Sequence, residues 1–582
     1  MKKSTMKWLT LVLAMIMLLA ACGGGGDDAT EAATDAGQTE GDATATETDD
    51  NEADAPDDAA DAPAGEGRYL RSNNPSEPGS LDPALAQGTH ESWILQHSFE
   101  GLMTYDKDGN IVPGMAADEP VISDDGLTYT FTVRDDVKWS NGDPVTAHDF
   151  EFAWKRVADP DLAADYAYQV FYIEGMEELF TGEDVNGDGT VATVDDVGVK
   201  ALDDHTLEVK LVNPTGFFTE LTAFYTYFPV NKAVVEANPE WANNADTYVS
   251  NGPFTLESWE HNAKILLKKN PEYYDAAQIT IEGIDLDVID DDNTAYQKYD
   301  GGEYDMLVSI PPVVIGEMVD NQNPELVLGP QAGTYYYNLN AEVSPFNNPK
   351  VRRAFAMALD RETITQKISK GGEIPAEGIV PFGFMDENGE EYRNKMENSI
   401  AFDAAGAKAL LEEGLAEEGV TVDVFNDMAL LYNTSETHRL IAQAVQEMWR
   451  TNLGINIGLE NVDFQVKLDR EKAGDYQISR AGWIGDYADP MTMLDLWHSE
   501  SSFNDANYNN PEYDALIDSI KASPDQAFRF EKMREAENML NEDMPVVPVY
   551  FYTLPYLVKP NVEGVYKTLL NFPTVTYATI TD

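Results

Sequence analysis

Apolar and polar residues alternate along this chain with two different periods. From Thr128 to Val133, threonine alternates with Tyr, Phe and Val, which is the pattern of a half-buried strand. From Val546 to Tyr552 the residues are almost all apolar, which predicts a buried strand. From Val351 to Leu359 the apolar residues instead fall at helical spacing and form one face. The pattern therefore predicts a mixed α and β protein.

Residues that favour helix ends frame several of the predicted helices. Thr146 is a plausible N-cap for a helix that runs to about Val157. Asp403 precedes a second helix that ends near Gly419. Ser435 precedes a third, with Ile, Ala, Val, Met and Trp on its inward face. We find no internal repeat between these elements.

The N-terminus has the pattern of an export signal. Lysines at the start precede an apolar run from Trp8 to Ala21. This run is too short for an ordinary membrane span and is typical of a signal peptide, which we assign to residues 1–21. It ends at Leu-Ala-Ala-Cys22, which resembles a bacterial lipobox and implies cleavage before Cys22 and lipid attachment to its thiol. Cys22 is the only cysteine of the chain, so no intramolecular disulfide is possible.

Residues 22–67 are interpreted as the lipidated cysteine followed by an acidic, disordered tether. This segment contains 15 acidic residues, no Lys or Arg, and no aromatic residue. Such a composition cannot bury enough apolar surface to offset the entropy of ordering. We expect an exported lipoprotein, held on the extracytoplasmic face of the cell membrane by its lipid and separated from the bilayer by this tether.

Length and charge narrow the possible functions. With 582 residues, the chain is expected to form two or three domains. The formal net charge is −66, and residues from 68 onward still hold 35 basic and 89 acidic side chains. Such a surface repels nucleic acid and anionic lipid, so neither is expected as a partner. We interpret the acidity as adaptation to high salt, which a loss of stability on desalting would test.

One stretch combines a carboxylate with residues suited to binding. Asp486 follows Trp483 closely and lies between a glycine and a tyrosine. A carboxylate in apolar surroundings is costly unless a cation pairs with it. Asp486 is therefore either part of a buried turn satisfied by backbone N–H groups, or the partner of a ligand's ammonium group. Trp483 would form a rigid wall, and Gly482 and Gly485 would let a ligand approach the backbone.

Motifs ordered along the chain carry a family resemblance. They include Gly126–Phe131, Lys138–Ala147, Asn251–Phe254, Tyr335–Tyr337, Tyr432–Ser435 and Val547–Tyr550. Together they resemble the extracytoplasmic solute-binding proteins of peptide ABC importers (family 5). The resemblance extends from about Leu70 to about Tyr566, and it is stronger to the oligopeptide-binding members than to the dipeptide, nickel or oligosaccharide members.

This resemblance implies an α/β fold of the periplasmic-binding-protein type (type II, cluster C), with two lobes, a hinge and an extra domain. Lobe I would comprise residues 68–99, 230–332 and 554–582. The extra domain would comprise residues 100–229, and lobe II residues 333–553. The ligand would lie in the cleft between the lobes and be enclosed by hinge closure.

The resemblance also implies a binding mode for short peptides, which the protein would deliver to the permease subunits of an importer. An extended peptide would pair through its main chain with strands on both cleft walls. Asp486 would bind the peptide's α-ammonium group, with backbone groups from Gly482 and Ile484 and a pocket wall from Trp483.

Several other residues match positions that contact the peptide in the family. These are Tyr166 and Tyr552, the cationic residues Arg480 and His438 toward the peptide's C-terminus, and a strand edge at Gln87, Gly88 and Thr89. Two alternatives stay open at this point. The alternative for Tyr166 and Tyr552 is core packing, and the alternative for His438 is a solvent-exposed position in the first turn of a helix.

A second motif lies outside the family pattern. Residues 184–195 read D-x-N-x-D-G and end in an acidic residue at position 12, which resembles the calcium loops of dockerins and EF-hands. The oxygen ligands would come from Asp184, Asn186, Asp188, Thr190 and Asp195. The alternative is an acidic solvent loop. We expect no required cofactor, and at most a structural calcium ion.

Two other functional classes are alternatives to peptide capture. The same fold would serve another solute, such as a dipeptide, a nickel chelate or an oligosaccharide, although Asp486 favours a ligand with an ammonium group. A peptidase is the remaining alternative. The sequence contains no HExxH, no GxSxG and no cysteine nucleophile in the folded part, so we expect a binding protein rather than an enzyme.

Overall fold

The computed structural model describes residues 68–187, 189–396 and 400–581, and these form one compact unit. The predicted signal peptide, Cys22, the acidic tether and Asp188 of the predicted calcium loop lie outside the described residues. In the part of the chain that is described, no helix has the length and apolar character needed to cross a bilayer.

The first of three main sheets has four strands in the order β1 (Tyr69–Asn74), β10 (Gly283–Val288), β9 (Lys264–Lys269) and β8 (Phe254–Glu260). β1 runs parallel to β10, and the other pairs are antiparallel. Helix α1 (Thr89–Ser98) lies near β8, and the ring of its His97 lies 6.3 Å from that of Phe254. This sheet belongs to the predicted lobe I.

The second sheet is antiparallel, in the order β4 (Val121–Ile122), β5 (Thr128–Thr132), β7 (Thr206–Lys210) and β6 (Val199–Asp203). β5 confirms the strand predicted from alternation. Helix α2 (Ala147–Val157) packs on β6 and β7 and has the predicted bounds. Its N-cap residue Thr146 is held by Asp149, whose Oδ2 accepts from the backbone N–H (2.8 Å) and hydroxyl (2.9 Å) of Thr146.

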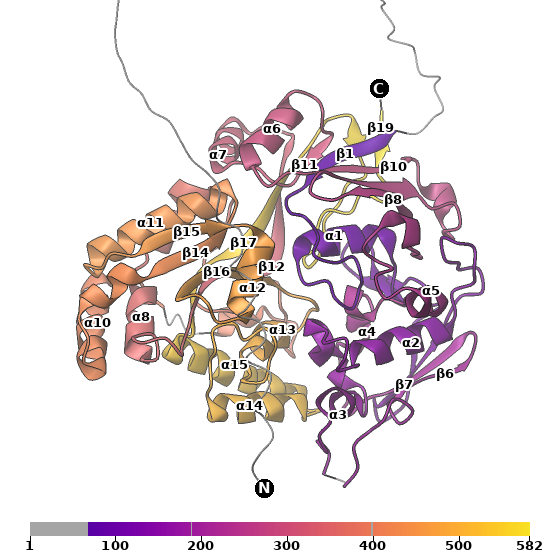
Figure 1. Cartoon of the computed structure of the whole chain (residues 1–582), viewed down its shortest axis with the longest axis horizontal. Helices are drawn as coiled ribbons and strands as arrows, with labels where there is room; N and C mark the ends of the chain where they lie inside the picture. The colour runs from indigo at the N-terminus through magenta and orange to yellow at the C-terminus, as the bar shows by residue number, and fades with distance from the viewer. Residues whose placement is uncertain (1–67, 188, 397–399, 582) are drawn as a thin grey trace, which may run out of the picture. The chain divides into compact units, whose positions relative to one another are not determined.

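The third sheet has seven strands and holds the centre of the molecule (Figure 1). Its order is β11 (Met306–Leu307), β17 (Val546–Val558), β12 (Leu326–Leu339), β16 (Ile478–Ile484), β14 (Ala429–Asn433) and β15 (Gly458–Val462), with β13 (Ile374–Pro375) added to β17. β17 extends well beyond the strand predicted at residues 546–552.

β12 and β17 are the two long strands of this sheet, with 14 and 13 residues. They pair antiparallel to each other, and the far end of β17 pairs with β11. Beside β11, the carboxylate of Asp305 accepts two hydrogen bonds of 2.8 Å from the guanidinium of Arg71 in β1. β12 and β17 therefore extend from the centre of the third sheet to the side that faces the first sheet. β12 crosses the predicted boundary of lobe II at residues 332/333, and β17 crosses the one at residues 553/554. The domain boundaries themselves stay a prediction.

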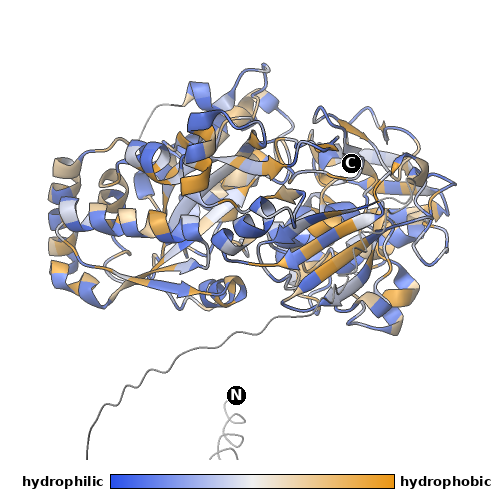
Figure 2. Cartoon of the chain, turned by 90° about the horizontal axis from the view of Figure 1, so that it is seen from above, coloured by the Kyte–Doolittle hydropathy of each residue, from blue (hydrophilic) through white to orange (hydrophobic). Residues whose placement is uncertain are grey.

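Helices α8 (Pro349–Met357), α10 (Ala404–Glu418) and α11 (Glu436–Asn452) confirm the helices predicted beside this sheet. The side chain of Asp403 accepts from the backbone N–H of Gly406 at the start of α10 (2.9 Å), and Gly419 ends it with φ 69°. Figure 2 shows hydrophobic and hydrophilic residues mixed along the helices, as expected for helices that bury one face.

The remaining helices and strands of the described residues lie between or beside these elements. They are β2 (Met103–Tyr105), β3 (Ile111–Pro113), η1 (Asp165–Tyr172), α3 (Met176–Thr181), α4 (Phe218–Leu221), η2 (Tyr225–Tyr227), α5 (Lys232–Ala237), η3 (Ala245–Thr247), η4 (Ala276–Gln278), α6 (Asp292–Asp300), α7 (Pro312–Asn321), α9 (Arg361–Thr363), η5 (Ile364–Ser369), η6 (Tyr392–Lys395), η7 (Val422–Asp427), α12 (Phe464–Lys472), α13 (Met491–Leu494), η8 (Asp495–Trp497), α14 (Pro511–Lys521), α15 (Gln526–Asp543), β18 (Val562–Glu563) and β19 (Thr579–Ile580).

Candidate functional site

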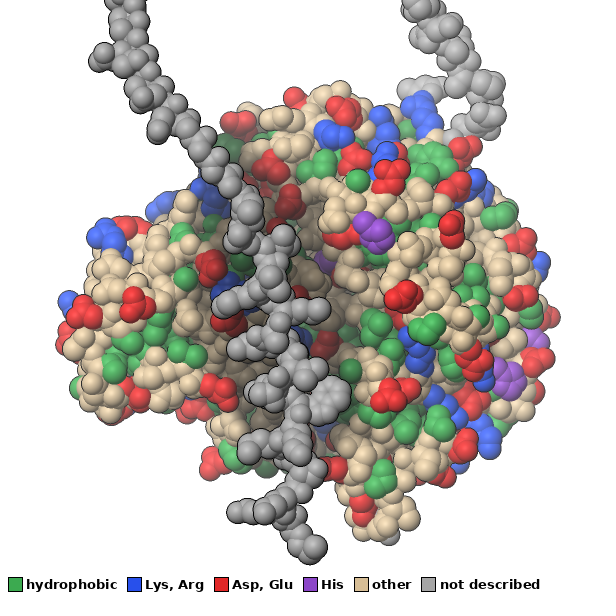
Figure 3. All heavy atoms as spheres, in the orientation of Figure 1, with side chains coloured by type: hydrophobic (Ala, Val, Ile, Leu, Met, Phe, Trp, Pro, Cys, Tyr) green, Lys and Arg blue, Asp and Glu red, His purple; other side chains and the backbone are tan. Residues whose placement is uncertain are grey.

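A cavity of about 960 Å³ lies between the segments that carry the three sheets. Its walls come from α1 and η1, from the strands β12, β16 and β17, and from the first turn of α11. The space-filling view is hollowed along this line (Figure 3). Every residue predicted to contact a peptide lines this cavity: Gln87, Gly88, Thr89, Tyr166, His438, Arg480, Gly482, Trp483, Ile484, Asp486 and Tyr552.

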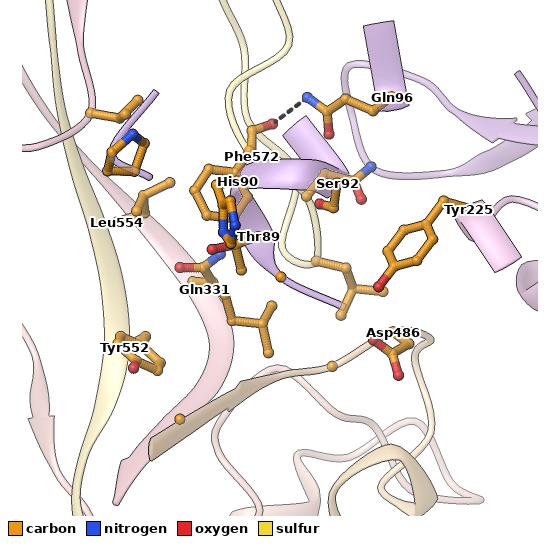
Figure 4. A pocket seen from close by; sticks show the side chains of 18 of the residues that line it. Thr89, His90, Ser92, Gln96, Tyr225, Gln331, Asp486, Tyr552, Leu554 and Phe572 are labelled. Atoms are coloured by element: carbon orange, nitrogen blue, oxygen red, sulfur yellow. Dashed lines mark hydrogen bonds between the residues drawn. The ribbon is translucent and has the colours of Figure 1, made fainter. Parts of the chain in front are cut away.

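Asp486 lies two residues beyond the end of β16 and is only 8% exposed. Its Oδ2 accepts a hydrogen bond of 2.8 Å from Nε2 of Gln169 in η1. Its backbone N–H donates to the hydroxyl of Thr492 (3.0 Å). Figure 4 shows Asp486 and Tyr225 facing each other across this end of the cavity.

The surroundings of the Asp486 carboxylate are aromatic and uncharged. Burial raises its pKa well above 3.8, and the hydrogen bond from Gln169 opposes this only in part. Tyr166, Tyr168 and Tyr225 are close enough that its charge, after burial, helps to raise their pKa values. Among the described residues, no Lys, Arg or His forms an ion pair with it. The alternative interpretation, in which backbone N–H groups of a turn satisfy the Asp486 carboxylate, does not hold. Its donor is the side chain of Gln169.

One edge of β16 is open toward the cavity. β14 pairs with β16 only at Ile478 and Ser479, so residues 480–484 have no strand on that side. On the other side, β12 pairs with β16 as far as Ile484, and the N–H of Gly485 donates to the carbonyl of Ala332 (2.8 Å). Because backbone groups of successive residues in an antiparallel strand turn to opposite sides, those of Gly482 and Ile484 turn away from β12.

Arg480 and Tyr552 lie together on one face of this edge. Nη2 of Arg480 donates to the hydroxyl of Tyr552 (3.0 Å), and its guanidinium lies 4.8 Å from the ring centre of Tyr335. A Cβ at Gly482 would fall 2.2 Å from the Tyr552 hydroxyl, so any larger residue would have to displace that ring.

His438 requires a correction. It is half-buried in the cavity wall, so it is not a solvent-exposed residue of the first turn of α11. Burial, together with the positive charges of Arg480 and Lys467, lowers its pKa well below 6.5. The lowered pKa favours the neutral imidazole in the ligand-free cavity, and the role of His438 toward a peptide's C-terminus stays a prediction.

The strand edge expected at Gln87–Thr89 is also wrong. Thr89 is the first residue of α1, and Gly88 is its N-cap. The N–H of Gly88 donates to the carboxylate of Glu91 (2.8 Å), which closes the first turn of the helix and uses a group that a strand edge would present. The three residues still line the cavity.

For Tyr166, core packing and contact with the cavity are both observed. It is 4% exposed, and its ring centre lies 4.7 Å from that of Phe503 and 6.0 Å from that of Trp483. Trp483 and Phe503 meet edge to face at 4.9 Å. These three rings, from η1, β16 and the 498–510 segment, form a rigid aromatic wall.

Sequence reasoning missed Gln169 and Tyr225, which complete the surroundings of Asp486. Gln169 is 317 residues from Asp486, and no spacing rule connects positions so far apart. The signal that was available is the composition of η1, where three tyrosines surround a single glutamine.

The predicted calcium loop lies on the surface. The Asp184 carboxylate accepts from the N–H groups of Gly187 (2.8 Å) and Gly189 (2.9 Å). Within the described part of the chain, which omits Asp188, no cluster of three or more His, Cys, Asp or Glu has the geometry to hold a metal ion. The calcium site stays a prediction.

The mixed α/β fold, with a cavity of about 960 Å³ lined by its strands and helices, is that of a solute-binding protein. Comparison with protein families agrees: residues 110–505 match the middle region of the bacterial extracellular solute-binding proteins, family 5. The chain therefore belongs to this family, whose members bind solutes and are not enzymes.

Two relatives illustrate the similarity. The oligopeptide-binding protein OppA of Bacillus subtilis is 38% identical over 569 residues, which cover 96% of each chain. The crystal structure of Haemophilus influenzae OppA in complex with the peptide RPPGFSPFR superimposes with a TM-score of 0.80 at 32% identity, covering 88% of this chain and 99% of that one.

A third relative indicates which conformation the structure has. A structure of the Escherichia coli murein tripeptide binding protein MppA gives a TM-score of 0.80 at 32% identity and covers 88% of this chain and 98% of that one. The unliganded open form of the same protein gives only 0.58 at 33% identity, covering 86% of this chain and 96% of that one. The cleft of this chain is therefore not in the open form.

Proposed function

We propose that this protein captures oligopeptides in its cleft and delivers them to the permease of an ABC importer. The observation that carries the proposal is Asp486, a buried carboxylate with no cationic partner among the described residues, located at the end of an open strand edge. A buried carboxylate is stabilised strongly when a ligand ammonium group supplies the missing charge.

The geometry supports a simple binding mode. The α-ammonium group of a peptide would pair with Asp486, and the peptide main chain would continue along β16 toward Arg480. There the outward-turned N–H and C=O groups of Gly482 and Ile484 would form an added strand with it. Main-chain pairing is independent of side-chain identity, so one site would accept many sequences.

The other solutes are less well supported. An oligosaccharide has no ammonium group and would leave Asp486 unpaired. A dipeptide would pair with Asp486 but would use only part of the cavity of about 960 Å³, which lies at the upper end of the usual range for small-molecule sites. The relative from Haemophilus influenzae holds a peptide of nine residues.

Mass spectrometry of ligand released from the purified protein tests the proposal most directly. We expect a mixture of peptides with free N-termini. Calorimetric titration of the unfolded and refolded, ligand-free protein with one such peptide and its N-acetylated form gives the quantitative test. Equal affinity for the two forms would contradict the role of Asp486.

Two further parts of the proposal depend on residues outside the described range. We propose that lipid on Cys22 holds the protein at the membrane and that the acidic tether leaves it free to reach the permease. We also propose that calcium binds the loop at residues 184–195 and stabilises it without taking part in peptide binding.

A further inference from the structure

The wall of the cleft carries an excess of negative charge. Among the described residues that line the cavity, eight are Asp or Glu and three are Lys or Arg. Asp486 accounts for one of the acidic residues, because it would pair with the peptide's N-terminus. A second carboxylate, which forms no hydrogen bond or ion pair with a described residue, lines the cavity at Asp505.

Asp505 lies beside the aromatic wall, two residues after Phe503 and half-buried. Its main chain is fixed, because its carbonyl oxygen accepts from the hydroxyl of Tyr476 and from Nδ2 of Asn507 (3.4 Å). Its side-chain carboxylate forms no hydrogen bond or ion pair with any described residue, in contrast to its neighbours. It lines the cavity and is available to a ligand.

The charges around Asp505 do not balance. Its titration is influenced by two other carboxylates, Glu471 and Asp165, and by two lysines, Lys467 and Lys472. Lys467 is paired with Glu471, and both are buried. Lys472 is paired with Asp165 (3.1 Å) and donates to the carbonyl of Ser502, and its ammonium group lies 4.7 Å from the ring centre of Phe503. Each lysine thus has another partner. Three carboxylates, Asp505, Glu471 and Asp165, face only two lysines, so the group carries one uncompensated negative charge when all are ionised.

This imbalance affects the Asp505 carboxyl itself. Burial and the negative charge of Glu471 raise its pKa to about 7, and the two lysines lower it only in part. A cation placed in the cavity would favour the ionised form and would restore the balance of charge in the group.

We propose that Asp505 and the indole of Trp483 form a subsite for a basic side chain of the bound peptide, a lysine or an arginine. The proposal rests on the peptide-binding function given above. The apolar stem of the side chain would lie along the indole of Trp483, and its charge would meet Asp505. The substrate class is then narrower than peptides in general: peptides with a basic residue near the N-terminus.

The strand geometry limits which peptide residues this subsite can recognise. In an extended chain successive side chains turn to opposite faces. Trp483 and Ala481 share one face of β16, whereas Arg480 and Gly482 share the other with Tyr552. The subsite would therefore recognise alternate peptide positions, and a basic residue shifted by one position should lose the preference.

The test uses ligand-free protein and pentapeptides of alanine with free termini. Lysine is placed at the first, second or third position, and a matched set carries norleucine, which keeps the stem and removes the charge. Calorimetry gives the ratio of the dissociation constants for each norleucine and lysine pair. We expect lysine to bind about tenfold more tightly than norleucine, or better, either at the second position alone or at the first and third positions. At the other positions the two dissociation constants should be nearly equal.

Two variants locate the effect. Asp505→Asn should bring the ratio close to one while peptide binding is retained. Asp118→Asn removes the same charge from an exposed loop outside the cavity and should leave the ratio unchanged, which separates a local contact from the attraction of an acidic surface. The ratio should also be larger at about pH 8 than at about pH 6, because protonation of Asp505 removes its charge.

Each outcome is decisive. A preference for lysine that disappears in Asp505→Asn supports the subsite. Equal binding of lysine and norleucine peptides to the wild type overturns it and leaves the peptide-binding function intact. If Asp505→Asn does not fold, the wild-type ratio still decides. If none of the pentapeptides binds, both the subsite and the proposed function are wrong.

Discussion

Replacing Asp486 by asparagine keeps the shape of the side chain and removes its negative charge. In the structure the carboxylate is 8% exposed and has one side-chain donor, Gln169. Losing one partner of a buried, hydrogen-bonded charge pair typically costs about 2–5 kcal/mol. We therefore expect Asp486→Asn to weaken binding of an unblocked peptide by about 30-fold to several thousand-fold.

The same substitution should have the opposite effect on the stability of the ligand-free protein. Burial raises the pKa of Asp486 well above its ordinary value of 3.8, so the folded protein holds this proton more tightly than the unfolded chain does. The wild type consequently loses stability relative to Asp486→Asn as the pH rises above 3.8, and the difference stops growing above the folded-state pKa. At neutral pH the variant should melt at a higher temperature than the wild type.

Calorimetry with a peptide and its N-acetylated form, on wild type and variant, isolates the interaction. We expect the substitution to weaken binding of the unblocked peptide and to change binding of the acetylated peptide little, because only the former presents an ammonium group. The reasoning is refuted if the variant binds the unblocked peptide as tightly as the wild type does, or if both peptides lose affinity equally.

Further predictions concern stability, the strand edge and the segments outside the described range. Burial raises the pKa of Glu100 to about 7. The wild type should therefore lose up to about 3 kcal/mol of unfolding free energy relative to Glu100→Gln as the pH rises from 4.5 to 7. Denaturation measurements that give the same pH dependence of stability for both proteins would contradict this. Gly482→Ala places a methyl group 2.2 Å from the Tyr552 hydroxyl, so all peptides should bind about tenfold more weakly or worse; unchanged calorimetric affinity would refute it. Calcium should raise the melting temperature of the wild type but not of Asp188→Ala, and equal shifts would exclude the loop as the site. Cys22→Ser should move the protein to the soluble fraction on cell fractionation, and retention in the membrane would count against the lipid anchor.

Much of the local structure follows from the sequence because it is decided within a few residues. Thr146 and Asp149, or Asp403 and Gly406, are close along the chain, and their hydrogen bonds form wherever the helix lies. Alternation of side chains predicted β5 for the same reason. The error at Gln87–Thr89 arose because these residues were matched to a strand edge of the family without considering Glu91. The Glu91 carboxylate accepts from the N–H of Gly88, the N-cap of α1, and this starts a helix.

The residue types at the centre of the site were also readable in sequence. Asp486 lies within a few residues of Trp483 and two glycines, which are unusual neighbours for a carboxylate. The resemblance to the family then implied that this stretch binds the ligand. What the sequence left open was the partner of the carboxylate. A buried turn and a ligand site need the same residues, and they differ only in what surrounds them.

Tertiary structure decided those surroundings. It brought Gln169 to within 2.8 Å of Asp486 across 317 residues and placed His438, half-buried, beside Arg480. It also placed Asp505 near two lysines that each have another partner. Burial and charge balance depend on which distant segments meet, and no local pattern encodes that meeting. The sequence by itself determined the elements and the family, whereas the packing of distant segments determined which charges in the cleft are available to a ligand.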